Sequence, residues 1–205
     1  MLFFGNQPIQ TSPLSASFAS KVTFLRNLEI QQANCITSET QLMSSFHVRR
    51  KEREITDAAE LRMVLKTTKY VTIALCMDGE PYLVSLSHGF DEAKNCLYFH
   101  CAPEGKKLTY AQANNRVWGQ AVLDFGVTEE CDYSYTSVHF AGTLSLISDL
   151  AEKRHALEVL VWQVSLNPEE KLAKVKPEKL AKTTIGKIDI NYMSGKKHQA
   201  PKTQT

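Results

Sequence analysis

The residues from Tyr98 to Lys107, with the sequence YFHCAPEGKK, combine side chains that could bind an anion and transfer a proton. A strand-like segment ends in His100 and Cys101, a Pro-Glu-Gly turn follows, and two adjacent lysines begin a helix-like run. Glycine lets the backbone approach a ligand closely, and the first turn of a helix presents free N–H groups. Lys106 and Lys107 add positive charge at that place. The segment therefore predicts a phosphate site, although a solvated helix start explains the two lysines equally well.

The elements that would position this turn are hairpin-linked strands and short helices. Asp57 with Glu60, and Asp149 with Glu152, are capping boxes that predict helices over 57–67 and from residue 150 onward. Asp78-Gly79 is a hairpin signal. The expected strands are 70–77, 81–90, 96–102, 116–125, 134–148 (bent at Gly142) and 184–193. This order predicts a mostly β (α+β) fold, a six-stranded antiparallel barrel, and no dinucleotide or P-loop motif is present.

Composition limits the remaining possibilities. The 205 residues are 43% hydrophobic and 22% charged, which suits one domain of about 150 residues with extensions. A net charge of +2 gives no support for nucleic-acid binding, and no apolar run approaches the ~20 residues of a membrane span. The five cysteines are odd in number and lack C-x-x-C spacing, so neither a disulfide framework nor a metal site is expected. Reduced thiols fit a cytoplasmic protein.

The two ends of the chain differ from its middle. Residues 1–44 are rich in Ser, Thr, Gln and Asn and show no sustained apolar period. They are expected to form a disordered extension, or to be non-native if translation begins at Met43. Residues 45–198 would form the folded domain, and residues 199–205 a flexible tail.

Four segments, RRKEREITD, PYLVSLSHGFDEAKNCLYFHCAPEGKKL, YTSVHFAGTLSLISDLAEKRHALEVL and IDINYMSGKKH, occur in an order that resembles a known family. It is the flavin-nucleotide-binding split-barrel family related to pyridoxamine 5′-phosphate oxidase, and the closest branch is that of the nitroimidazole-resistance (Nim) flavoproteins. The resemblance covers about residues 45–198. It implies a six-stranded split barrel with short peripheral helices, and a homodimer with FMN in two clefts at its interface.

The resemblance also implies positions for the cofactor. In such barrels the backbone of one strand contacts the flavin ring, and the turn after the next strand holds the phosphate. The expected contacts are Leu83, Val84, Ser85, Leu86, Ser87, His88, Phe99, His100, Cys101, Gly105, Lys106 and Lys107. The oxidases carry an Arg-Lys pair where this chain has Lys-Lys. Charge is kept but the bidentate grip of arginine is lost, so tighter FMN binding than in the relatives is not expected.

The predicted activity is that of an FMN-dependent oxidoreductase acting on a small substrate, including nitro compounds. His100 would be its catalytic residue, because a histidine can donate a proton near neutral pH. A strand histidine that only packs is the alternative. Two other functions remain open: a split barrel that binds haem (with His88 or His100 as ligand) or a deazaflavin, and a flavin-binding or redox-sensing module without turnover.

Three further features have plainer interpretations. Trp118 and Trp162 are expected in the core or at a dimer interface. The charged run from Arg49 to Arg53 is expected to be solvated. His139, on the long fifth strand, has no partner that the sequence identifies.

Overall fold

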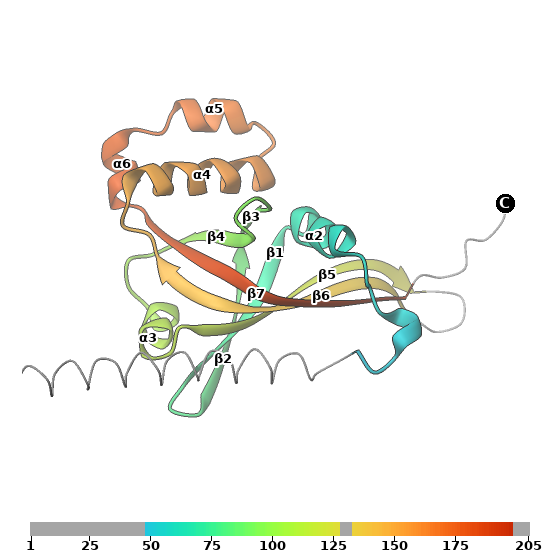
Figure 1. Cartoon of the computed structure of the whole chain (residues 1–205). Coiled ribbons are helices and arrows are strands. Elements are labelled where there is room, and N and C mark those ends of the chain that lie inside the picture. The colour runs from blue at the N-terminus through green and yellow to red at the C-terminus, as the bar shows by residue number, and fades with distance from the viewer. Residues whose placement is uncertain (1–47, 128–132, 199–205) are drawn as a thin grey trace, which may run out of the picture. The chain divides into compact units, whose positions relative to one another are not determined.

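The computed structural model describes residues 48–127 and 133–198. The expectations for residues 1–44 and 199–205 lie outside the described residues. The described part contains a seven-stranded antiparallel sheet with the order β2-β1-β5-β6-β7-β4-β3 (Figure 1). The strands are β1 (Tyr70–Met77), β2 (Glu80–Ser87), β3 (Gly89–Asp91), β4 (Cys96–Cys101), β5 (Arg116–Val127), β6 (Tyr133–Leu146) and β7 (Thr184–His198). The helical elements are η1 (Lys51–Arg53), α2 (Ala58–Thr67), α3 (Lys106–Ala113), α4 (Leu150–Val164), α5 (Pro168–Ala173) and α6 (Pro177–Lys182).

The sheet confirms the mostly β prediction but differs from it in strand number and closure. The single strand expected over 81–90 is interrupted at His88, and its two parts become β2 and β3 at opposite ends of the strand order. The hydrogen-bonded sheet is therefore not closed. β2 pairs only with β1, so one side of its backbone has no ladder partner within the described sheet. An edge strand of this kind can offer N–H and C=O groups to a ligand.

Two local predictions about the sheet are confirmed. Asp78 and Gly79 join β1 to β2 with φ angles of 52° and 81°, as a two-residue hairpin turn requires. β6 shifts its register against β7 between Ala141 and Gly142, where the bend was expected. A Cβ atom at Gly142 would lie 2.3 Å from the carbonyl oxygen of Asp189, so a larger residue would push the two strands apart.

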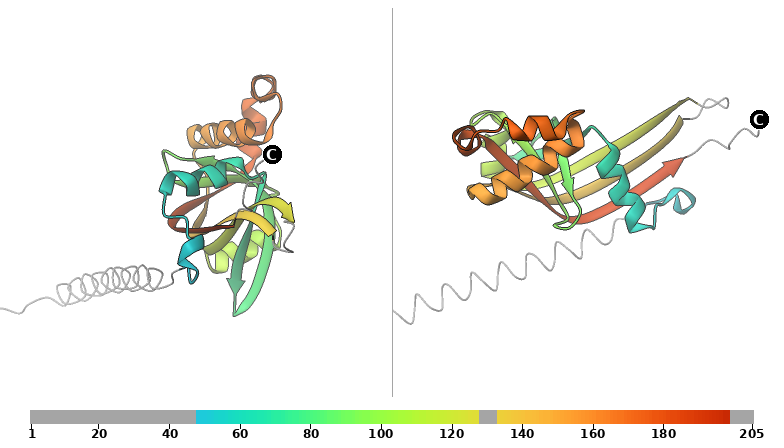
Figure 2. Two further views of the ribbon diagram at one scale, coloured as in Figure 1. Left: turned by 90° about the vertical axis from the view of Figure 1, so that its right-hand side faces the viewer. Right: turned by 90° about the horizontal axis from the view of Figure 1, so that it is seen from above.

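The interior is divided between two apolar clusters that share β4. Leu97 and Phe99 point into the main core, which α2 covers with Leu61, Val64 and Leu65. The alternate residues of β4 point the other way, so Cys96 and Tyr98 join a second cluster beneath α4 and α6. Figure 2 shows these helices lying against the outside of the sheet, opposite the side from which the β1–β2 hairpin projects. β4 thus directs successive side chains to different parts of the molecule.

The connection from β6 to β7 contains three helices. The backbone N–H of Ile147 donates to the carbonyl oxygen of Ile185 at 2.9 Å, which joins the two ends of this connection. Asp149 accepts a hydrogen bond from the Glu152 backbone N–H at 2.7 Å, and this cap confirms the predicted start of α4. Residues 167–183, for which the sequence analysis predicts no helix, form α5 and α6, each with proline as its first residue.

Candidate functional site

The turn between β4 and α3 has the geometry of an anion cradle. Gly105 caps α3 with φ 134°, and a Cβ placed on it would meet no atom within 4 Å, so the space beside it is open. No side chain caps the helix, and its first turn contains no acidic residue. The backbone N–H groups of Lys106 and Lys107 precede the first intrahelical bonds, which leaves them available to an acceptor.

The two lysines are held over aromatic rings. The Lys106 ammonium lies 4.7 Å from the centroid of the Tyr82 ring and 5.3 Å from that of Tyr110. The Lys107 ammonium lies 5.0 Å from the centroid of Phe99. Such contacts fix the position of a cation without neutralising it. Neither ammonium forms an ion pair with another residue of the described part, so both charges remain available to an anionic ligand.

β2 brings alternate residues to the two faces of the sheet beside this turn. Leu83, Ser85 and Ser87 are exposed on the outer face. Val84 and Leu86 point inward and pack in or against the main core, so any contact they make with a ligand must come from their backbone. The contact between the flavin ring and the backbone of β2 stays a prediction.

His88 does not join these residues. Its side chain is only 1% exposed, and its Nε2 atom lies 2.8 Å from the carbonyl oxygen of Leu65 and 3.0 Å from Nε2 of Gln163. Burial lowers the pKa of His88 from its usual value, and its Nδ1 atom is buried without a partner. The ring is enclosed between α2 and α4. It is therefore removed from the expected flavin contacts and from the candidate haem ligands.

The end of β4 also separates residues that were expected to act together. Phe99 is buried beneath Lys107, and Cys101, half-buried, packs against the main core. Burial raises the pKa of Cys101, and the nearby charge of Lys107 opposes this, so the thiol is mostly protonated at neutral pH. His100 is exposed and, by strand alternation, points to the face of β4 opposite to these two residues.

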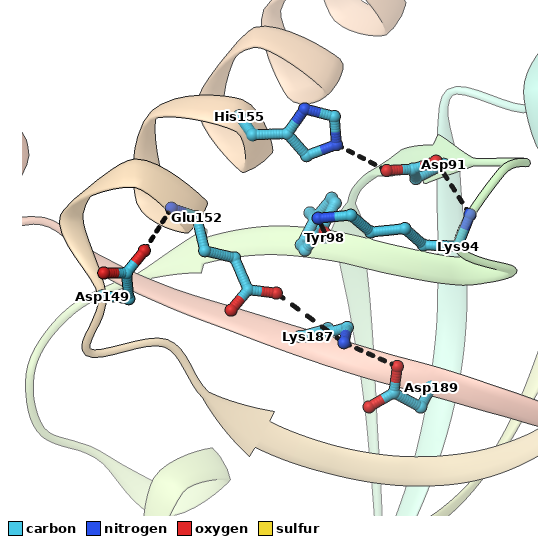
Figure 3. A network of polar contacts seen from close by, with 8 residues as sticks. All are labelled: Asp91, Lys94, Tyr98, Asp149, Glu152, His155, Lys187 and Asp189. Atoms are coloured by element: carbon cyan, nitrogen blue, oxygen red, sulfur yellow. Dashed lines mark hydrogen bonds and ion pairs between the residues drawn. The ribbon is translucent and has the colours of Figure 1, made fainter.

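A second polar network lies beneath α4, and sequence analysis did not find it (Figure 3). Nε2 of His155 is 2.6 Å from Oδ2 of Asp91, a carboxylate that is 7% exposed and that also accepts from the Lys94 backbone N–H. The His155 ring meets the Tyr98 ring edge-on at 5.9 Å. Burial would raise the pKa of Asp91, but the hydrogen bonds from His155 and Lys94 outweigh it and the pKa is lowered. The network fastens α4 to the β3–β4 hairpin.

The same helix is also fastened to β7. Lys187 bridges Glu152 of α4 at 3.7 Å and its own strand neighbour Asp189 at 2.8 Å (Figure 3). The ion pair with Asp189 raises the pKa of Lys187. None of these groups touches the Gly105 turn, and no cluster of three metal-ligating side chains occurs within residues 48–127 and 133–198. The network therefore connects elements of the fold, and the candidate site is the anion cradle formed by Gly105, Lys106 and Lys107.

Sequence analysis missed Tyr82 and Tyr110, whose rings pack against each other at 5.2 Å and both contact the Lys106 ammonium. The available signal was an aromatic residue in each of the two segments flanking the turn. Strand or helix aromatics are usually taken as core residues, and only the fold brings these two together.

The arrangement of hairpins, the β4–α3 turn and the final long strand agrees with a comparison against protein families. The family model described as pyridoxamine 5′-phosphate oxidase matches residues 57–197. The chain belongs to this family. No relative is found among the curated proteins. Within residues 48–127 and 133–198, no helix has the length and apolar character of a membrane span.

Solved structures give the same fold. A proposed 5-nitroimidazole antibiotic resistance protein from Bacteroides thetaiotaomicron is 25% identical with a TM-score of 0.61, covering 70% of this chain and 85% of that one. The flavocytochrome Anf3 from Azotobacter vinelandii is 20% identical with a TM-score of 0.64, covering 78% and 76%. A FAD and haem binding protein from Mycobacterium smegmatis is 20% identical with a TM-score of 0.60, covering 75% and 77%. The last two likenesses concern the fold alone.

Proposed function

We propose that this member of the pyridoxamine 5′-phosphate oxidase family binds FMN and uses it to reduce a small substrate. The observation that carries the proposal is the open Gly105 turn, which has two uncapped backbone N–H groups and is followed by two lysines whose ammonium groups form no ion pair with another described residue. A phosphate monoester matches this donor set, because backbone N–H groups and lysine point charges both bind phosphate oxygens. The resemblance to a Nim-type protein makes a nitro compound the first substrate to test.

The residues present fit FMN in two ways. Gly105, Lys106 and Lys107 would hold the phosphate, and the open space at the glycine leaves room for its oxygens. The free backbone edge of β2 would contact the ring, with Ser85 and Ser87 as further polar neighbours on the exposed face. When bound, FMN supplies the hydride and electron chemistry, and the chain supplies binding and orientation.

The role of His100 as proton donor is a proposal that rests on the family resemblance alone, because its side chain points to the face of β4 opposite to the cradle. It lies at the end of β4, it is exposed, and it forms no hydrogen bond or ion pair with another described residue. A histidine imidazole can donate a proton to a bound substrate. His100→Ala should lower turnover without releasing the cofactor, because the anion cradle lies on the face of β4 opposite to His100.

The proposed assembly is a homodimer that contacts through the outer face of the sheet. Three large apolar side chains are exposed there: Leu83 is 67% exposed, Trp118 41% and Val122 46%. Trp118 was expected in the core or at an interface; its exposure excludes the core and supports the interface as a proposal. A flat sheet face with this many apolar groups is usually covered by another protein surface.

The test is the visible spectrum of the purified protein, followed by release and mass identification of the chromophore. We expect oxidised FMN. The Lys106→Ala/Lys107→Ala variant should bind FMN about 30-fold more weakly, since two exposed charge contacts contribute about 1 kcal/mol each. Lys171→Ala/Lys174→Ala, in α5 and at its C-cap, removes the same charge away from the cradle and should bind normally. Full FMN retention by the first variant would contradict the phosphate role.

The same spectrum separates the alternatives. A Soret band would indicate haem, for which the burial of His88 leaves His100 as the expected ligand of the two considered. A flavin spectrum without turnover of any nitro compound or other small electron acceptor would indicate a binding or sensing module instead. Fold alone does not decide between these functions.

A further inference from the structure

Two tyrosine rings from different elements contact the Lys106 side chain at the start of α3. The ammonium lies 4.7 Å from the centroid of the Tyr82 ring, on β2, and 5.3 Å from that of Tyr110, on α3. The two ring centroids are 5.2 Å apart, and the ring planes are inclined at 55°. The helix and the β1–β2 hairpin therefore supply one ring each to the same lysine.

The contact with Tyr110 follows from the geometry of the helix itself. Residues four apart lie on the same face of a helix, and helical side chains lean toward its N-terminus. The ring of Tyr110 therefore extends back along α3 to the first turn, where Lys106 follows the N-cap residue Gly105. Tyr110 is only 5% exposed, so its ring is a fixed part of the core. The same lean directs the Lys106 side chain toward the Gly105 turn.

Tyr82 adds a restraint that the helix cannot supply. An exposed lysine has a flexible stem and samples many conformations. Tyr82 is half-buried, packs against the main core and pairs with Leu75 of β1, so its ring has a defined place. Its hydroxyl forms no hydrogen bond with another described residue, which leaves the ring face as the group that acts on Lys106.

The rings position the ammonium of Lys106 without neutralising its charge. A cation over an aromatic face is attracted by the quadrupole of the ring, and it keeps its hydrogen-bond donors for a ligand. Lys106 forms no ion pair within residues 48–127 and 133–198. An ammonium that is already positioned loses less conformational freedom when an anion binds, and this raises the affinity for the anion.

Tyr82 also connects the two parts of the proposed cofactor site. It directly precedes Leu83, the first residue of the β2 segment that would contact the flavin ring. Successive residues of a strand point to opposite faces, so Tyr82 can contact α3 while Leu83 and Ser85 lie on the outer face. The strand proposed to contact the flavin ring thus also contacts a lysine proposed to bind the phosphate.

We propose that Tyr82 is a positioning residue through which the site selects phosphorylated flavin. The inference rests on the proposed FMN function. The Tyr82 ring acts through Lys106, because it keeps the ammonium at the Gly105 turn and does not itself touch the phosphate. Riboflavin has the same ring system as FMN and lacks the phosphate. Tyr82 should therefore contribute to the affinity for FMN and not to the affinity for riboflavin.

The first experiment compares the two flavins. Dissociation constants of FMN and riboflavin are measured by flavin fluorescence during titration with the full-length apoprotein. Tyr82→Leu should weaken FMN binding about fivefold and leave riboflavin binding unchanged. Tyr82→Phe keeps the ring and should bind FMN as the wild type does. If Tyr82→Leu weakens both flavins equally, the residue supports β2 as a whole and the inference is wrong. An unchanged FMN constant in Tyr82→Leu refutes it as well.

The second experiment tests whether Tyr82 acts through Lys106. Lys106→Ala should also weaken FMN binding about fivefold, and Tyr82→Leu/Lys106→Ala should bind FMN no more weakly than Lys106→Ala alone. Independent effects would multiply to about 25-fold, and that result overturns this inference while the proposed function stands. A wild-type chain that binds FMN no better than riboflavin refutes the phosphate role together with the inference. A wild-type chain that binds neither flavin overturns the proposed function itself.

Discussion

Replacement of His155 by alanine removes the main hydrogen bond to a nearly buried carboxylate. A hydrogen bond to a charged group contributes about 1.5–3 kcal/mol, and the 43% exposure of the His155 side chain places it at the lower end, about 1.5 kcal/mol. For a folded unit of this size, the melting temperature should fall by about 3–6 °C at pH 7. Urea unfolding followed by circular dichroism measures the same loss as a free energy.

The pH dependence of the stability lost in His155→Ala tests whether the hydrogen bond to Asp91 causes the loss. The folded-state pKa of Asp91 is lowered, so its contribution is present above the unfolded value of about 3.9 and is lost as the pH falls through the folded value. The deficit of His155→Ala should therefore be full at pH 6–7 and shrink below about pH 4. Arg154→Ala, which breaks the exposed pair with Glu158, is the matched control and should cost about 0.5 kcal/mol or less. A deficit that persists unchanged at pH 3 would assign the effect to packing on Tyr98 and refute the electrostatic account.

Three other outcomes are expected. Gly105→Ala should weaken FMN binding at least tenfold, because φ 134° is strained for alanine. Gly126→Ala, strained at φ 92° near the end of β5, should lower stability without changing the FMN dissociation constant; equal FMN affinities of the two variants would contradict this. Leu83→Glu should make the protein monomeric in sedimentation velocity. Leu166→Glu, at a side chain that is 99% exposed beyond α4, should leave it dimeric. A dimeric Leu83→Glu variant would exclude the outer face of the sheet as the dimer interface. Iodoacetamide should modify Cys101 more slowly than free cysteine at pH 8, because the pKa of Cys101 is raised. Mass spectrometry of the Cys101 peptide measures this rate, and modification faster than that of free cysteine would contradict the prediction.

Most of the fold could be predicted because short-range signals and tertiary structure agree. The Asp149 cap, the Asp78-Gly79 turn and the bend near Gly142 depend on neighbouring residues, and all three are confirmed. The helices α5 and α6 were missed because they are short, and proline at their first positions resembles a loop signal. An apolar residue of a helix need not be buried: Leu150, the first residue of α4, is 55% exposed.

The candidate site was predictable only in part. The Gly105 turn follows from local sequence, and the structure confirms the uncapped start of α3 that the two lysines occupy. The alternation of β2 already placed His88 on the face of Val84 and Leu86, and this face is buried. The rings that hold Lys106 could not be inferred, since Tyr82 and Tyr110 become neighbours only when β2 packs against α3. Side-chain contacts over such sequence distances depend on the folded sheet.

The backbone hydrogen bond between Ile147 and Ile185 holds the two ends of the β6–β7 connection, which contains α4, α5 and α6, next to each other at the sheet. Because the cost of closing a flexible loop grows only slowly with its length, residues can be added to or removed from the middle of this connection with little effect on the strands. The β6–β7 register is set independently of it. The connection between α5 and α6 is therefore a natural place for evolution, or for an experimenter, to insert a new module while the anion cradle stays intact.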